Sequence, residues 1–298
     1  MKLNVLYLIV FSTAAQAAPT RDLIVGGQNV SRRDPIAGST VGIFSPNPDG
    51  RTGALCSGTL IKGDIALTAA HCIEPGAKPV VIFDRDLHAP GAPRRVAEGV
   101  AVNPKWRTQR RKGMDQGDIA LVKFGGSLPA GYHAVPAAGA ELPQGSPVTL
   151  AGYGITNART HEGAGILRKT RVRVLNARPG KSEMVLDQSH GHGACHGDSG
   201  GPAYVRSGGH VAVAGLTNRS YPNSAPDDCA HDVVYTKVPA YRNWIQASEK
   251  KLENAPPPPL REGIRARAHP RAVSAKSGKR RLASAKIRRV ARRRARGR

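Results

Sequence analysis

Long apolar runs are lacking in this chain of 298 residues. The apolar stretch at residues 5–11 follows Lys2 and precedes Ala15-Gln16-Ala17, and it is too short to span a bilayer stably. A basic residue, a short apolar core and small residues in this order are typical of a secretory signal. We therefore expect residues 1–17 to be a signal peptide and the protein to be secreted or extracytoplasmic, which means periplasmic in a Gram-negative host.

Cysteine is also scarce, with only four residues in the chain. No pair has the C-x₂₋₄-C spacing of a structural zinc site, so we predict no metal and no cofactor. Export makes disulfides the better use of these residues, and four cysteines allow three pairings.

The most informative segment, residues 197–202, reads GDSGGP. Ser199 is a weak nucleophile by itself, and it needs a general base that is in turn held by a third group. The glycines suit a tight turn whose backbone N–H groups converge on one small volume, as a developing oxyanion requires. Without partners, the same string also fits a flexible acidic turn.

Two upstream segments contain the partners that such a serine needs. His71 ends a small apolar run, LTAAHC, and Asp118 opens another, GDIALV. Asp115 is a near neighbour that competes with Asp118, but only Asp118 directly precedes a continuous apolar run. The chain order is therefore His71, Asp118 and Ser199, one of three orders known for the same catalytic geometry.

With these motifs, the chain resembles the trypsin/chymotrypsin family of serine proteases over residues 24 to 250. The segment Ile24-Val25-Gly26-Gly27 matches the new N-terminus that the family exposes when a zymogen is cleaved. The resemblance implies an all-β fold of two six-stranded antiparallel barrels with a C-terminal helix. We accordingly divide the chain into a pro-segment (18–23), a protease domain (24–253) and a basic tail (254–298).

The resemblance also implies a role for each motif residue. Ser199 would be the nucleophile, His71 the general base and then acid, and Asp118 the group that orients the imidazole. The N–H groups of Gly197 and Ser199 would form the oxyanion hole, and Asp198 would pair with the ammonium of Ile24. The implied disulfides are Cys56–Cys72 and Cys195–Cys229. Activation would then require a cut after Leu23.

Short runs rich in Val, Ile, Leu and Thr between turn residues independently favour a β-sandwich or barrel. Examples are residues 80–83, 148–151 and 211–214. We place the divide between the barrels near residues 127–145, and an amphipathic helix over residues 239–253 that packs on the second barrel.

The specificity pocket departs from that of trypsin. Trypsin-like members carry an acidic residue six positions before the nucleophile, and here that position is Gly193, followed by Ala194. A Lys or Arg side chain would be buried there without a partner. Together with Val233 near the pocket floor, this predicts cleavage after small to medium apolar residues. Asp232 leaves an alternative open, because a carboxylate turned into the pocket would restore a basic preference.

A second departure lies at the edge that pairs with substrate. Asn218 and Arg219 stand where the family usually has Ser and Trp. At the rim of the site Arg219 would favour acidic groups along the substrate, and the alternative is an ordinary solvated arginine.

From Ala255 onward the chain contains 16 Lys and Arg and one acid, Glu262, a net of +15 out of +24 for the whole sequence. A segment of this composition is expected to be disordered when free. We hypothesise that residues 255–298 attach the protein to an anionic polymer or membrane surface, and the alternative is a solubilising extension that is trimmed away. No aromatic residue occurs there, so base stacking is excluded.

The sequence thus predicts a monomeric, secreted serine endopeptidase that acts on protein or peptide substrates. The competing hypothesis is a catalytically idle homologue that binds a surface or a polyanion. The complete His71, Asp118 and Ser199 set favours the enzyme, because idle homologues commonly lose one of these residues.

Overall fold

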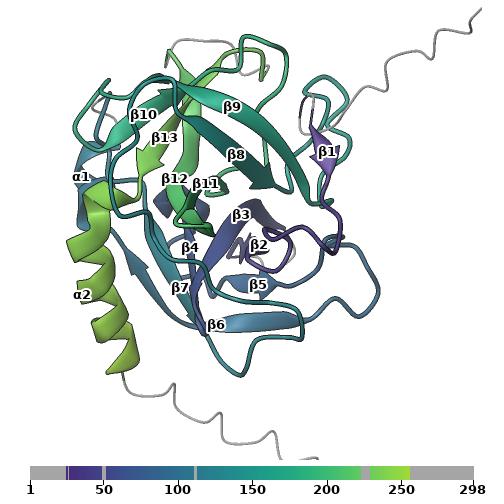
Figure 1. The fold of residues 1–298 in the computed structure, drawn as a ribbon. Coiled ribbons are helices and arrows are strands. Elements are labelled where there is room, and N and C mark those ends of the chain that lie inside the picture. The colour runs from purple at the N-terminus through teal and green to yellow at the C-terminus, as the bar shows by residue number, and fades with distance from the viewer. Residues whose placement is uncertain (1–24, 26, 49–51, 111–112, 223–228, 256–298) are drawn as a thin grey trace, which may run out of the picture. The chain divides into compact units, whose positions relative to one another are not determined.

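The computed structural model describes residues 25, 27–48, 52–110, 113–222 and 229–255, and its regular structure is mostly antiparallel β-strand (Figure 1). The predicted signal peptide, the pro-segment, Ile24 and the tail from residue 256 lie outside the described residues.

The first barrel is closed by six strands in the order β2-β3-β4-β7-β6-β5. Its core is formed by fully buried side chains such as Leu60, Val122 and Phe124. The strand bounds are β2 (Thr40–Pro46), β3 (Gly53–Lys62), β4 (Ile65–Thr68), β5 (Val80–Ile82), β6 (Arg94–Val102) and β7 (Ala120–Phe124).

The second barrel has the order β9-β10-β13-β12-β11-β8, and the pairing of β8 with β9 closes it. In β9 the residues alternate between the interior and the surface, so that Val172 and Val174 are buried while Arg171 and Arg173 are exposed. The bounds are β8 (Pro147–Gly152), β9 (Arg168–Asn176), β10 (Glu183–Leu186), β11 (Pro202–Ser207), β12 (His210–Tyr221) and β13 (Asp232–Lys237), and β1 (Gln28–Asn29) pairs with β9.

The two-barrel fold class predicted from the sequence is therefore confirmed. The apolar runs at residues 148–151 and 211–214 fall in β8 and β12, and the run at residues 80–83 coincides with β5 and the one residue after it. The connection between the barrels runs from the end of β7 at Phe124 to the start of β8 at Pro147, and it includes the expected divide at 127–145.

Helical structure among the described residues is limited to short elements. The predicted C-terminal helix is present as a 3₁₀ turn, η2 (Pro239–Tyr241), followed by α2 (Arg242–Glu253). A second 3₁₀ turn, η1 (Ala70–Cys72), follows β4. The sequence analysis missed α1 (Pro104–Gln109), which is capped by Asn103. None of the helices among the described residues is both long and apolar enough to cross a membrane.

The expected packing of the C-terminal helix is wrong. Tyr241 does anchor η2 on the second barrel, because its hydroxyl donates to Ser182 Oγ (3.0 Å). The main part of α2, however, packs against β6 and β7 of the first barrel (Figure 1). Leu252 lies over Gly99 of β6, where even a Cβ would stand 2.9 Å from Leu252 Cδ2. Helical periodicity identified the apolar face, but it contains no information about which barrel receives that face.

Candidate active site

His71 and Asp118 are held together at two points. The backbone N–H of His71 donates to Asp118 Oδ1 (2.9 Å), and His71 Nδ1 is 2.7 Å from Asp118 Oδ2. His71 lies in η1 directly after β4, and Asp118 is fully buried just before β7. Because β4 and β7 are paired neighbours in the first barrel, their adjacent ends bring the two residues together.

This contact changes the electrostatics of the imidazole. Burial disfavours the charged ring, but the negative charge of Asp118 and its hydrogen bond together outweigh that effect. The pKa of His71 is therefore raised above its ordinary value of 6.5. The hydrogen bond at Nδ1 leaves Nε2 as the ring nitrogen available to accept a proton.

Asp118 has further partners on the second barrel. With its amide nitrogen turned toward the carboxylate, Asn218 donates to Asp118 Oδ2 (2.9 Å), and its oxygen accepts from Arg219 Nη1 (3.1 Å). Thr236 Oγ1 donates to the backbone carbonyl of Asp118 (3.0 Å). The sequence analysis did not assign Asn218 to the site, although its position in place of the family's usual Ser was a signal.

Arg219 fits neither expectation from the sequence: its side chain is not available at the rim to bind acidic substrate groups, and it is not a solvated arginine. Its guanidinium forms a bidentate pair with Glu183, at 3.0 Å for Nη1–Oε1 and 2.8 Å for Nη2–Oε2. Glu183 is 1% exposed and therefore needs this partner. A buried carboxylate on β10 was not visible as a partner from the sequence, and both readings of Arg219 are corrected.

Asp115, the near neighbour of Asp118, is used elsewhere. It adopts a positive φ of 59° and accepts hydrogen bonds from Lys181 N (2.9 Å), Ser182 N (2.6 Å) and Ser182 Oγ (2.9 Å). Burial raises the pKa of Asp115, but these hydrogen bonds outweigh it and the net shift is downward. Asp115 thus ties a loop to the start of β10, while Asp118 contacts His71.

The loop that contains Ser199 is pressed against the first barrel. The Ser199 carbonyl accepts from Ser57 N (2.9 Å), and the Gly197 carbonyl accepts from Ser57 Oγ (2.9 Å). Gly200 has φ +71°, and a Cβ there would stand 2.1 Å from Thr68 Oγ1. Only glycine fits this close approach, which brings half-buried Ser199 beside the strand that leads to His71.

Two backbone N–H groups of this loop are left without a protein acceptor. Within the described ranges, the N–H groups of Gly197 and Ser199 donate to no protein acceptor. The intervening Asp198 N–H is occupied, since it donates to the Cys195 carbonyl (3.0 Å). These are the two N–H groups that the sequence analysis predicted for the oxyanion hole, and both remain available for a ligand.

Asp198 is 2% exposed, and its carboxylate accepts from Gly154 N (2.8 Å) and Cys195 N (2.9 Å). Burial, opposed by these amides and by the charges of Arg168 and His196, raises the pKa of Asp198 to about 6. Ile24, its predicted partner, lies outside the described residues, but the next residue does not. Val25 O accepts from Gly193 N (2.8 Å), which ties the segment after Ile24 to the loop before Ser199.

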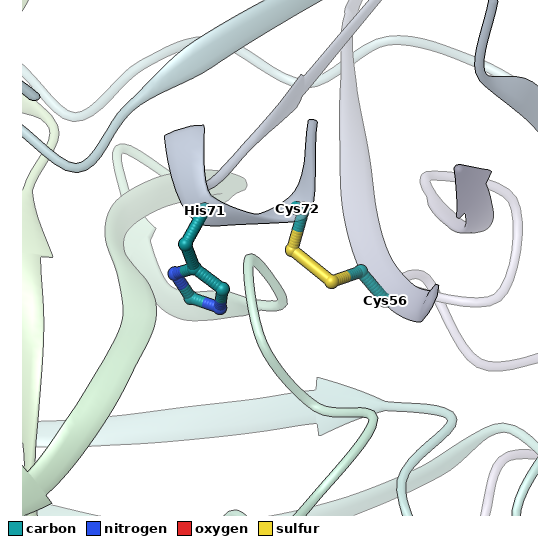
Figure 2. A group of neighbouring side chains, drawn as sticks. All are labelled: Cys56, His71 and Cys72. Carbon is teal, nitrogen blue, oxygen red and sulfur yellow. A yellow bond between two sulfur atoms is a disulfide. The ribbon is translucent and has the colours of Figure 1, made fainter. Parts of the chain in front are cut away.

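The cysteines form the two disulfides that the resemblance implied, Cys56–Cys72 and Cys195–Cys229. Figure 2 shows the first of them beside His71, with the imidazole and the disulfide leaving the same turn in different directions. In the described part of the chain, two groups of side chains lie close enough together to share a metal ion. One group is Cys56, His71 and Cys72, and the other is Cys195, His196 and Cys229. Both contain disulfide sulfurs, which are not the thiolates that bind metals.

The predicted pocket residues lie together on the second barrel. Gly193, Ala194 and Val233 are all buried, and Ala194 and Val233 belong to one apolar cluster. Asp232 is already occupied, because its Oδ1 accepts the backbone N–H of Gln188 (2.9 Å). The sequence analysis did not single out Gln188, which the structure shows to be 2% exposed and hydrogen-bonded to the backbone of Ala194.

Two closed six-stranded antiparallel barrels followed by a short C-terminal helix define the chymotrypsin fold. The family model described as Trypsin matches residues 24–245, and this chain belongs to that family of serine proteases.

Three curated proteins illustrate its relatives. The chain is 28% identical over 245 residues to a chymotrypsin of Phaedon cochleariae, covering 76% of this chain and 82% of that protein. It is 28% identical over 258 residues to chymotrypsin-like elastase family member 1 of Macaca fascicularis, covering 80% and 94%. It is 28% identical over 215 residues to serine protease SP24D of Anopheles gambiae, covering 66% and 72%.

Proposed function

We propose that this protein is an exported serine endopeptidase that hydrolyses peptide bonds with Ser199, His71 and Asp118. The observation that carries the proposal is the two-point contact between His71 and buried Asp118, next to the Ser199 loop. Such a contact holds one tautomer of the imidazole and leaves Nε2 free to act as a base. A homologue that is only a binding protein has no need of it.

In the proposed reaction, Ser199 Oγ bonds to the carbonyl carbon of the substrate while His71 Nε2 takes the hydroxyl proton. The carbonyl oxygen becomes an oxyanion at the N–H groups of Gly197 and Ser199. The C–N bond then breaks, and His71 returns the proton to the leaving amine. Water, activated by the same imidazole, hydrolyses the acyl-enzyme and regenerates Ser199.

Activation is proposed to occur by cleavage after Leu23. The new ammonium of Ile24 would pair with Asp198, whose buried carboxylate has a pKa of about 6 and accepts from the backbone N–H groups of Gly154 and Cys195. The Val25–Gly193 bridge supports this route, because it lies one residue beyond that new N-terminus.

The proposed substrates are proteins or peptides with a small to medium apolar residue on the acyl side of the scissile bond. Gly193 provides no carboxylate for Lys or Arg, and Asp232 is bonded to Gln188 rather than free. Leu23 is an apolar residue of this kind, so the protease would accept its own activation site.

Export is supported by the two disulfides, which persist in oxidising compartments. For the basic tail we propose electrostatic attachment to an anionic surface, on the basis of its net charge of +15. Removal of residues 256–298 should abolish retention on heparin at low salt and leave peptide hydrolysis unchanged. Equal retention of both forms would refute this role.

The catalytic proposal is tested by labelling the cleaved protein with a serine-directed fluorophosphonate. We expect stoichiometric labelling of the parent, none of Ser199→Ala, and parental labelling of the control Ser207→Ala, whose serine is exposed on β11. Labelling that survives in Ser199→Ala means a different nucleophile. A folded, cleaved parent that neither labels nor hydrolyses peptides supports the idle homologue.

A further inference from the structure

Gln188 is a buried polar residue that the catalytic proposal does not use. It lies just beyond β10 and before the Ser199 loop, and it is 2% exposed. A buried carboxamide is costly unless its hydrogen-bonding groups find partners, so its contacts define a specific environment rather than a chance orientation.

Those partners come from two chain segments around the predicted pocket. Gln188 Nε2 donates to the His231 carbonyl (2.9 Å) and to the Ala194 carbonyl (3.3 Å), and Oε1 accepts from Ala194 N (2.6 Å). The backbone N–H of Gln188 donates to Asp232 Oδ1 (2.9 Å). The side chain therefore cross-links the segment before Ser199 to the segment that leads into β13.

The same carboxamide occupies the space in front of Gly193. A Cβ added at Gly193 would stand 2.1 Å from Gln188 Cδ and 2.2 Å from Gln188 Oε1. Real Cβ atoms do not approach other atoms this closely. The place that a side chain at position 193 would fill is thus already filled by Gln188, which reaches it from five residues upstream.

We propose that Gln188 is a specificity-determining residue, and that its carboxamide forms the floor of the pocket for the acyl-side residue. Together with Val233 it closes the pocket with a neutral surface and restricts the preferred side chains to small and medium apolar ones. This inference rests on the proposed endopeptidase function.

The chemistry of the floor explains the exclusion of charged substrates. Both N–H groups of the Gln188 carboxamide donate hydrogen bonds to main-chain carbonyls, so neither is left to bind a substrate carboxylate. A Lys or Arg side chain would meet a neutral group, and burying a cation without a partner is strongly unfavourable. Val233, 5% exposed and on the adjacent strand β13, adds apolar surface.

The effect of an aspartate at position 193 distinguishes a pocket closed by Gln188 from a pocket that merely lacks a carboxylate at Gly193. If Gly193 alone determined specificity, Gly193→Asp would create a basic preference. Because Gln188 fills that space, the single substitution should disrupt the pocket instead. Removing the carboxamide at the same time, in Gln188→Gly/Gly193→Asp, should make room for the new carboxylate.

The test measures kcat/KM on peptides that differ only in the acyl-side residue, namely Ala, Leu, Phe and Arg. Active sites are counted by fluorophosphonate labelling, so rates refer to folded enzyme. We expect Gln188→Gly to raise the Phe-to-Ala ratio of kcat/KM at least ~10-fold. We expect the double variant to raise the Arg-to-Ala ratio at least ~100-fold, and Gly193→Asp alone to label poorly. The control Gln28→Gly, exposed on β1, should keep the parental ratios.

A second pair of variants, without a new carboxylate, tests the same inference if the aspartate variants do not fold. Gly193→Ala adds only a Cβ, which should still clash with Gln188, and Gln188→Gly/Gly193→Ala should restore labelling. The inference is overturned if Gly193→Ala labels like the parent, or if Gln188→Gly leaves the Phe-to-Ala ratio within twofold. Failure of the proposed function looks different, because then the cleaved parent itself neither labels nor hydrolyses any peptide.

Discussion

The two barrels contribute to the site in different ways. In the first barrel, His71 and Asp118 follow or precede paired strands, and their mutual hydrogen bonds are already formed. In the second barrel, Ser199 and the N–H groups beside it lie on the loop between β10 and β11. Of the predicted pocket residues, Gly193 and Ala194 lie on the same loop, and Val233 lies in β13. His71 and Asp118 are placed by the paired ends of β4 and β7, whereas the Ser199 loop is held by separate backbone and side-chain hydrogen bonds, such as those from Ser57 N and Ser57 Oγ.

This difference indicates which side of the site the N-terminus can influence. Among the described residues, the strands of the first barrel pair only with one another, and β1, near the N-terminus, pairs with β9 of the second barrel. The loops of the second barrel depend on buried polar groups, above all on Asp198 and Gln188, and Gly193 is bonded to Val25. We therefore expect activation to change the nucleophile side and to leave the base side unaltered.

The largest effect is expected from Asp118→Asn. The carboxylate accepts the backbone N–H of His71 with Oδ1 and contacts the ring nitrogen with Oδ2, whereas an amide has one acceptor oxygen and one NH2 group. An NH2 group facing Nδ1 holds the imidazole in the wrong tautomer. We expect kcat/KM to fall by ~10⁴ with the fold retained. The control is Asp115→Asn, which should lower the melting temperature but leave kcat per labelled site within a few-fold. A comparable loss in both variants would contradict the distinction.

Asp198→Ala tests the nucleophile side. Without the carboxylate, the amides of Gly154 and Cys195 lose their acceptor and the oxyanion N–H groups lose their alignment. Loss of one such donor reduces kcat by ~10²–10³, and we expect a reduction of that size here. The His71 ring proton shared with Asp118 should keep its NMR shift. A changed shift would mean that the two barrels are not independent.

Cleavage before Ile24 should stabilise the protein most between about pH 6 and pH 8. The ordinary pKa of an aspartate is 3.8, and burial raises that of Asp198 to about 6. The buried charge therefore opposes folding of the uncleaved chain increasingly as pH rises from 4 through 6, by roughly 3 kcal/mol. The new ammonium compensates it fully up to about pH 8, the ordinary pKa of an N-terminus, and the compensation is lost above that as pH rises through the raised pKa of the paired ammonium. A difference in melting temperature that is independent of pH would exclude this pairing.

A smaller effect is expected for Asn218→Ala. Asp118 would lose one hydrogen bond that crosses from the second barrel but keep its two contacts with His71. We expect kcat to fall ~10-fold, since a hydrogen bond to a charged group contributes about 1.5–3 kcal/mol. The variant Asn218→Ser, which retains a donor, should recover part of the rate. Equal rates for all three proteins would remove Asn218 from the site.

The smallest effect is expected in the pH dependence of kcat/KM, whose fall on the acid side should lie at a higher pH than an ordinary histidine would give. Only neutral His71 acts as a base, so activity falls as pH drops through its pKa, which lies above 6.5. A plot of kcat/KM against pH should therefore bend above pH 6.5. A profile that stays flat down to pH 4 would contradict the role of His71.

Local patterns in the sequence were sufficient for much of this description. The apolar runs predicted strands that are present, and the position of Asp118 at the start of such a run distinguished it from Asp115. The tertiary structure added contacts between residues far apart in the chain, such as Arg219 with Glu183, 36 positions away. It also showed that α2 packs on the first barrel, because a helix's periodicity describes only its own face.

The sequence by itself determined the family and indicated the proposed chemistry, because a serine in a glycine turn, a histidine and a carboxylate are recognisable as local motifs in a fixed order. The tertiary structure decided the surroundings of those groups. It placed Asn218 on Asp118, buried Asp198 among backbone amides, and put the carboxamide of Gln188 where Gly193 has no side chain. Burial and hydrogen bonding across two barrels depend on distances in space, and no local pattern encodes them.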